Sequence, residues 1–154
     1  MQEKDEEWMA LALDEAKKAY DADEVPIGAV AICAEKGLIA KAYNQTIAAC
    51  DPCAHAEMNV IRQAAQVLGN HRLHTVTIYV TLEPCAMCAG AMVEARIKRV
   101  VFAARDFKAG AAGTVMNIVH HRALNHHVHI ADGLSAAASV ALLQKFFARK
   151  RIKT

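Results

Sequence analysis

The chain has 154 residues, a size at which one compact domain buries about 70% of the surface that its unfolded form exposes. Hydrophobic residues make up 55% of it and charged residues 22%, which excludes disorder as its default state. The formal net charge of +2 is too small to indicate a nucleic-acid-binding protein by itself. We expect a single domain spanning residues 1–154.

The N-terminus lacks the features of a secretory signal, because it is acidic and has no basic segment ahead of an apolar one. No apolar run approaches the roughly 20 residues of a membrane helix. The five cysteines are an odd number, which disfavours a disulfide framework. These features predict a cytoplasmic protein without membrane association, whose cysteines are metal ligands, nucleophiles or core residues.

The first half of the chain is predicted to form a helix, a hairpin and a second helix. Pro26 ends the first helical pattern, and Lys36-Gly37 is a turn signal between two apolar runs. The predicted elements, in chain order, are an amphipathic helix over 2–21, strands over 27–34 and 38–44, and a helix from about 55 to 68.

The second half alternates strands and helices. The predicted elements are a strand over 76–82, a helix over 86–95, a strand over 97–104, a loop over 105–117, a short strand near 129–130 and a basic helix over about 135–150. This alternation indicates an α/β fold, with a sheet covered by helices.

Two short segments at predicted helix starts carry the candidate chemistry. One contains His55 and Glu57, and the other contains Cys85 and Cys88 after Pro84. Cys85 and Cys88 are three positions apart, so their sulfurs share one face of a helical turn. Zinc binds thiolates and imidazoles tetrahedrally, and three protein ligands leave the fourth position for water. We therefore predict one Zn²⁺ per chain, held by His55, Cys85 and Cys88.

Glu57 is the candidate catalytic residue. Zn²⁺ with two thiolates and a neutral imidazole has no net charge, so it should acidify water less than a site of three histidines. A general base then becomes necessary, and Glu57 lies two residues from a ligand without being needed as one.

Other readings of these residues stay open at this point. Cys50 and Cys53 form a second CxxC pair that, with Cys85 and Cys88, fits a structural four-cysteine zinc site. Cys33 lies in a predicted strand and is expected in the core. The histidine cluster of residues 120–129 fits either a second metal site or, as we favour, titrating surface groups.

The order His-Ala-Glu followed by Pro-Cys-x-x-Cys resembles the zinc-dependent cytidine/deoxycytidylate deaminase superfamily. Within it, nearly the whole chain is similar to bacterial tRNA adenosine deaminases. The segments that carry this likeness include residues 24–30, Asp51-Pro52 before the first motif, residues 81–91 and residues 104–113, together with His120-His121 and Asn125-His126.

This resemblance implies a cytidine-deaminase-like three-layer α/β/α fold with a five-stranded mixed sheet, acting as a homodimer. It implies hydrolysis of adenosine to inosine at the wobble position of a tRNA anticodon, typically of an arginine tRNA. Activated water would attack C6 of the flipped-out adenine while Glu57 protonates N1 and then assists the departure of ammonia.

The resemblance also assigns residues to the substrate. Those expected around the target nucleoside are Ile27, Asn44, Ala56, Glu83, Pro84 and Ala86, with Asp106 near the RNA backbone. Departures from the family pattern occur at Gln45-Thr46, Cys50, Cys53, Phe107 and Arg122. They lie at the expected RNA rim, so they bear on affinity and sequence context and not on the chemistry.

The basic end of the chain suits phosphates, and the expected RNA-backbone contacts are Lys108, Arg149, Lys150 and Arg151. On sequence alone, a solvated terminal helix explains this charge almost equally well. A deaminase of free bases or nucleosides of the cytosine or guanine type is the alternative enzyme. A non-catalytic zinc-stabilised RNA-binding module is the alternative of another class, but it has no use for Glu57.

Overall fold

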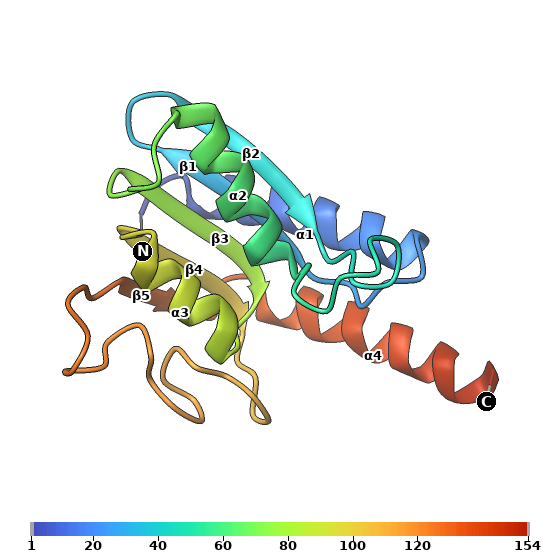
Figure 1. The fold of residues 1–154 in the computed structure, drawn as a ribbon. Coiled ribbons are helices and arrows are strands. Elements are labelled where there is room, and N and C mark those ends of the chain that lie inside the picture. Colours follow the sequence, from blue (N-terminus) through green and yellow to red (C-terminus); the bar gives the residue numbers. More distant parts are fainter. Residues whose placement is uncertain (1, 154) are drawn as a thin grey trace.

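The computed structural model describes residues 2–153 and contains a five-stranded mixed sheet between two layers of helices (Figure 1). The elements, in chain order, are α1 (Asp5–Asp21), β1 (Gly28–Cys33), β2 (Gly37–Tyr43), α2 (Ala56–Leu68), β3 (Val76–Leu82), α3 (Ala86–Glu94), β4 (Arg99–Ala104), β5 (His129–Asp132) and α4 (Ala136–Lys153). The predicted fold class and element order are confirmed. The last helix extends a few residues beyond its predicted end.

The strands lie in the order β2-β1-β3-β4-β5. The first three are antiparallel neighbours, whereas β3, β4 and β5 run parallel. The α3 helix connects β3 to β4, but β4 reaches β5 through an irregular segment over 105–128, which is coloured yellow to orange in Figure 1. The carboxyl ends of β3 and β4 therefore meet at one edge of the sheet, where this segment begins.

Helices α1 and α4 cover one face of the sheet, and α2 and α3 cover the other. Strand residues alternate between the two faces, so Val30, Tyr79 and Val101 pack with Met9 of α1. Their neighbours Ala29, Ile78, Val80 and Val100 belong to the larger core beneath α2 and α3. No helix within residues 2–153 has the length and apolar character needed to cross a bilayer.

The α1 helix is fixed to the sheet by close packing and by a buried ion pair. A Cβ atom at Gly28 would lie 2.1 Å from the carbonyl oxygen of Ala12 and 2.4 Å from the amide nitrogen of Ala16. At the start of the helix, Asp5 accepts two hydrogen bonds from Arg99, at 2.9 and 2.7 Å, and one of 2.5 Å from the Tyr79 hydroxyl.

Candidate metal centre and active site

The two predicted metal-binding segments meet at the N-terminal ends of α2 and α3. His55 is the residue before α2, Cys85 is the residue before α3, and Cys88 lies in the first turn of α3. The Nδ1 atom of His55 is 3.6 Å from the Sγ of Cys85 and 3.5 Å from the Sγ of Cys88. The fold thus brings together the three side chains that the sequence predicts as metal ligands.

This donor set fits zinc. Zn–S bonds of about 2.3 Å and Zn–N bonds of about 2.0 Å at tetrahedral angles place nitrogen and sulfur about 3.5 Å apart, close to the two distances found here. In residues 2–153, His55, Cys85 and Cys88 are the one group that offers three such ligand atoms within 4.8 Å of one another. Cys50 and Cys53 do not join it, so the four-cysteine site is not formed.

The electrostatics of the cluster favour a thiolate at Cys85, whereas the bond to Cys85 and burial hold the pKa of Cys88 well above its usual range. Hydrogen bonds with Cys88 and His55 lower the pKa of Cys85 to about 4. The position before a helix adds to this effect, since the unpaired backbone N–H groups there stabilise an anion. Metal ligation requires thiolate sulfur, so the site is prepared for a cation.

Glu57 lies in the first turn of α2, is 4% exposed and stands beside the three ligands. Burial raises the pKa of its carboxyl to about 7, and the neighbouring Cys85 adds to the increase. A carboxyl group with such a pKa can both take up and release a proton near neutral pH. Glu57 is not part of the three-residue ligand group, as the sequence reasoning required.

Asn44 follows β2 and is 5% exposed. Its Nδ2 atom donates a long hydrogen bond of 3.4 Å to the carbonyl oxygen of Val25. Its Oδ1 atom has no hydrogen-bond partner within residues 2–153, and buried acceptors of this kind are rare in folded proteins. A bound molecule with an N–H or O–H group would satisfy it.

The other residues expected at the substrate differ in what they offer. Ile27 is half-buried, Ala56 is fully buried, and Ala86 is exposed at the start of α3. The amide of Glu83 already donates to Ala104, and the carbonyl of Pro84 already accepts from Ala111. Asp106 accepts from the amides of Lys108 and Ala109, so its carboxylate shapes its own loop.

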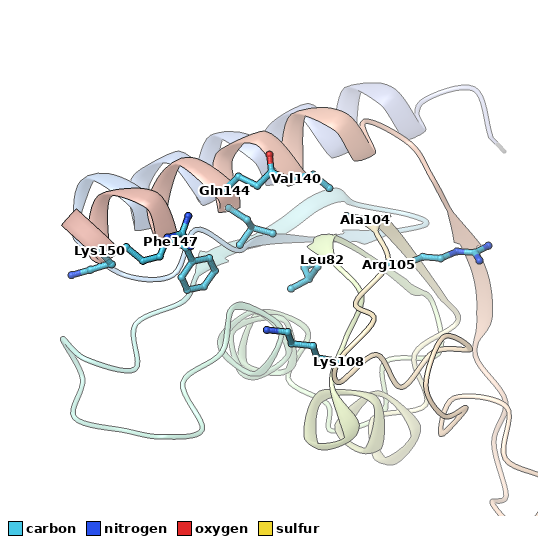
Figure 2. Close-up of a pocket in the computed structure, with 10 residues that line it drawn as sticks. Leu82, Ala104, Arg105, Lys108, Val140, Gln144, Phe147 and Lys150 are labelled. Atoms are coloured by element: carbon cyan, nitrogen blue, oxygen red, sulfur yellow. The ribbon is translucent and has the colours of Figure 1, made fainter. Parts of the chain in front are cut away.

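A groove of about 600 Å³ runs between α4 and the carboxyl ends of β3 and β4 (Figure 2). Its floor is apolar, with Leu82, Leu143 and the half-exposed ring of Phe147. Its rim contains Lys108 and Arg151, together with Arg105 and Lys150, which pair with Asp132 and Asp23. Leu82 of the groove stands three residues before Cys85 along the chain.

The predicted RNA contacts therefore separate into two groups. Lys108, Lys150 and Arg151 line the groove, although Lys150 also donates to Asp23 at 2.6 Å, and Arg149 does not line it. Arg149 instead donates to Asp23 at 3.0 Å and lies over the ring of Tyr20, 4.2 Å from its centroid. It joins α4 to the end of α1, which the spacing of charges along the helix did not reveal.

The histidine cluster forms no second three-ligand site within the described part of the chain. The rings of His120 and His127 stack at the surface with centroids 5.4 Å apart, and His126 bonds through Nε2 to the carbonyl oxygen of Ile97 at 2.7 Å. These contacts support the interpretation as surface groups. Cys33 is buried, as expected for a core residue.

The family model for the cytidine and deoxycytidylate deaminase zinc-binding region matches residues 2–104, which include all three ligands and Glu57. The chain belongs to this deaminase family. It is 44% identical over 149 residues to a tRNA-specific adenosine deaminase of Bacillus subtilis, an alignment covering 97% of this chain and 92% of the relative.

Solved structures of other members share the fold. One comes from a study of A-to-I editing by tRNA:A34 deaminases at the wobble position of transfer RNA. It is 42% identical, with a TM-score of 0.85, and covers 89% of this deaminase and 99% of that chain. A guanine deaminase from Nitrosomonas europaea is 25% identical, with a TM-score of 0.81 over 93% of this chain and 84% of its own.

Proposed function

We propose that this deaminase holds one Zn²⁺ and converts adenosine to inosine at the wobble position of a tRNA anticodon, consuming water and releasing ammonia. The observation that carries the proposal is the preformed His55, Cys85 and Cys88 cluster with the buried Glu57 beside it. The identity of 44% to a tRNA-specific adenosine deaminase supports the choice of substrate.

His55, Cys85 and Cys88 would hold the zinc, which when bound lowers the pKa of a water molecule and so prepares it for attack. Glu57 is the proposed proton carrier. It accepts one proton from the attacking water and delivers it to N1 of adenine, then accepts the second proton from the new C6 hydroxyl and passes it to the departing amino group. Burial brings the pKa of this carboxyl to about 7 before a cation binds, and in one turnover the carboxyl takes up and releases a proton twice.

Asn44 would orient the nucleoside, because its unpaired Oδ1 is ready to accept a hydrogen bond. Ile27 and Ala56 offer apolar surface, and Ala86 offers a backbone amide at the exposed start of α3. Glu83 and Pro84 contribute the rigid segment that leads into Cys85. Burial of the base between such groups excludes water other than the reacting molecule.

The groove beside α4 is the proposed binding surface for the anticodon stem-loop. Its basic rim suits phosphates, and the exposed ring of Phe147 suits an unpaired base. Lys108, Lys150 and Arg151 are the proposed backbone contacts. Asp106 acts through the shape of its loop. We extend the proposal to an arginine tRNA as substrate and to a homodimer, both on the family resemblance.

The second candidate is a deaminase of free bases, since a guanine deaminase shares the fold at 25% identity. The two candidates separate when zinc-loaded protein is incubated with an anticodon stem-loop carrying ACG and, in parallel, with free adenosine, cytosine and guanine. We expect mass spectrometry to show exchange of one amino group for oxygen in the stem-loop. Turnover of guanine with an unchanged stem-loop would overturn the proposal.

Metal analysis completes this test. We expect one zinc per chain in the wild type and in Glu57→Gln, and loss of zinc in Cys88→Ser. Retention of full zinc by the Cys88 variant would remove that residue from the site. Light scattering on the same samples reports the number of chains in the particle.

A further inference from the structure

Glu83 is a buried carboxylate that the proposed chemistry does not use. It is 2% exposed and stands between the last residue of β3 and the Pro84-Cys85 pair. Its side chain contacts the segment over 105–116, where it accepts several hydrogen bonds.

Each oxygen of this carboxylate accepts two hydrogen bonds. Oε1 accepts from the amide of Asp106 at 3.1 Å and from the hydroxyl of Thr114. Oε2 accepts from the amides of Ala112 and Thr114, at 3.0 and 3.1 Å. Backbone donors from both ends of the loop therefore converge on one side chain. Such charge-assisted bonds are about twice as strong as neutral ones.

Packing holds the loop in the same place. A Cβ atom at Gly110 would lie 2.5 Å from the Cδ of Glu83 and 2.6 Å from its Oε1, so the carboxylate lies against bare backbone. The amide of Ala111 donates to the carbonyl of Pro84 at 2.9 Å. The loop is thus fixed to both residues that precede the metal ligand Cys85.

The fixed loop carries part of the groove. Lys108 lies on the groove rim, and its amide bonds to Asp106, whose own amide bonds to Glu83. Figure 2 shows Lys108 reaching from this loop toward the groove, opposite Phe147 and Lys150 on α4. A shift of the loop would move one wall of the groove relative to the metal site.

We infer that Glu83 is a positioning residue, which fixes the 105–116 loop to the metal-binding segment. The loop wall of the groove and the metal site then keep a constant relative position. This inference rests on the proposed function for its RNA substrate. The organisation of the loop follows from the hydrogen bonds themselves. Glu83 acts through the loop and does not touch the reacting atoms.

The test compares zinc-loaded wild type with Glu83→Gln and Thr114→Val. The glutamine amide turns one acceptor into a donor that faces N–H groups, and valine removes only the hydroxyl donor. The matched control is Tyr79→Phe, which loses a buried hydrogen bond on the opposite face of the sheet. The readouts are hydrogen exchange at single amides by NMR, zinc content, and kcat and KM for the ACG stem-loop.

In Glu83→Gln we expect the amides of Asp106, Ala112 and Thr114 to exchange at least about tenfold faster. KM for the stem-loop should rise by about tenfold, with kcat changed much less and zinc still at one per chain. Thr114→Val should show the same pattern at a few-fold, which keeps the test decisive if Glu83→Gln folds poorly. Tyr79→Phe should lower stability without changing KM or these three amides.

An unchanged KM in both variants, or unchanged exchange at the three amides, would overturn the inference. Loss of zinc from Glu83→Gln would also overturn it, since Glu83 would then act on the metal ligands. Wild-type protein that leaves the stem-loop unreacted would refute the proposed function instead. In that case the exchange data still decide whether Glu83 organises the loop.

Discussion

Asp5, at the start of α1, and Glu57, at the start of α2, are carboxylates buried on opposite faces of the same sheet, at 0% and 4% exposure. Asp5 is neutralised by Arg99 and bonded to the Tyr79 hydroxyl, and these contacts hold its pKa well below its usual range. Burial raises the pKa of Glu57 to about 7, and the neighbouring His55 does not offset this increase in the metal-free site. A buried carboxylate that is paired with an arginine stays ionised and holds structural elements together. A buried carboxyl without such a pair takes up and releases protons near neutral pH.

The sharpest test of this contrast is Glu57→Gln. The amide keeps the shape of the side chain but cannot carry protons, so we expect kcat on the stem-loop to fall by about 10³-fold or more. Removing a poorly compensated acid should leave the free energy of unfolding unchanged or slightly higher. Kinetics and denaturant unfolding of the same preparation measure both. A large loss of stability would show that Glu57 is structural, as Asp5 is.

The counterpart is Asp5→Asn. It leaves the Arg99 guanidinium buried without its anion, and breaking such a pair costs about 3–5 kcal/mol. We expect a fall of this size in the free energy of unfolding, measured with urea, while kcat of the folded fraction stays near that of the wild type. A loss of activity at full stability would contradict the assignment of Asp5 to stability and of Glu57 to catalysis.

The pH dependence of stability gives a smaller effect with a defined sign. The pKa of Asp5 is lowered in the folded chain, so between that pKa and about 3.8 the unfolded chain binds more protons. The contribution of Asp5 is therefore present above about pH 3.8 and is lost as the pH falls toward the folded pKa. Urea unfolding in acid should show a shallower loss of stability with falling pH in Asp5→Asn. Equal slopes would mean that other carboxylates govern acid unfolding.

The smallest effect concerns two arginines that are two positions apart in α4. Arg151→Ala should weaken stem-loop binding a few-fold and reduce its salt slope by about 1, because it removes one phosphate contact. Arg149→Ala should mainly lower stability, because Arg149 packs on the Tyr20 ring and shares Asp23 with Lys150. Fluorescence anisotropy across a salt series and thermal melts measure the two effects. Weaker stem-loop binding in Arg149→Ala, with unchanged binding in Arg151→Ala, would place the RNA on the α1 side of α4.

The local parts of this structure were predictable from the sequence, and the non-local parts were not. Cys85 and Cys88 are three residues apart at a helix start, so their geometry follows from one turn of backbone. The strand over 76–82 was predicted without error because a β-branched run ends at a proline. The role of the Glu83 side chain depends on a loop more than twenty residues away, and no periodicity reports such a contact.

The groove was missed for the same reason. Its lining comes from β3, β4, the following loop and α4, which only the topology brings together. Charge alone grouped Arg149 with Arg151, although a helix places residues two positions apart on different sides. The sequence also cannot show that the Oδ1 of Asn44 lacks a hydrogen-bond donor, because this depends on which groups the fold places around it.

The absence of a side chain at Gly28 restricts which substitutions this protein can accept in α1. Because β1 touches the backbone of α1 there, positions 12 and 16 admit little beyond alanine, and any enlargement would push the helix outward. A helix grafted in place of α1 would need small residues at positions 12 and 16 as well as Asp5. Substitutions on the inner face of α1 and in β1 are therefore constrained together, whereas the outer surface of α1 is not bound by this contact.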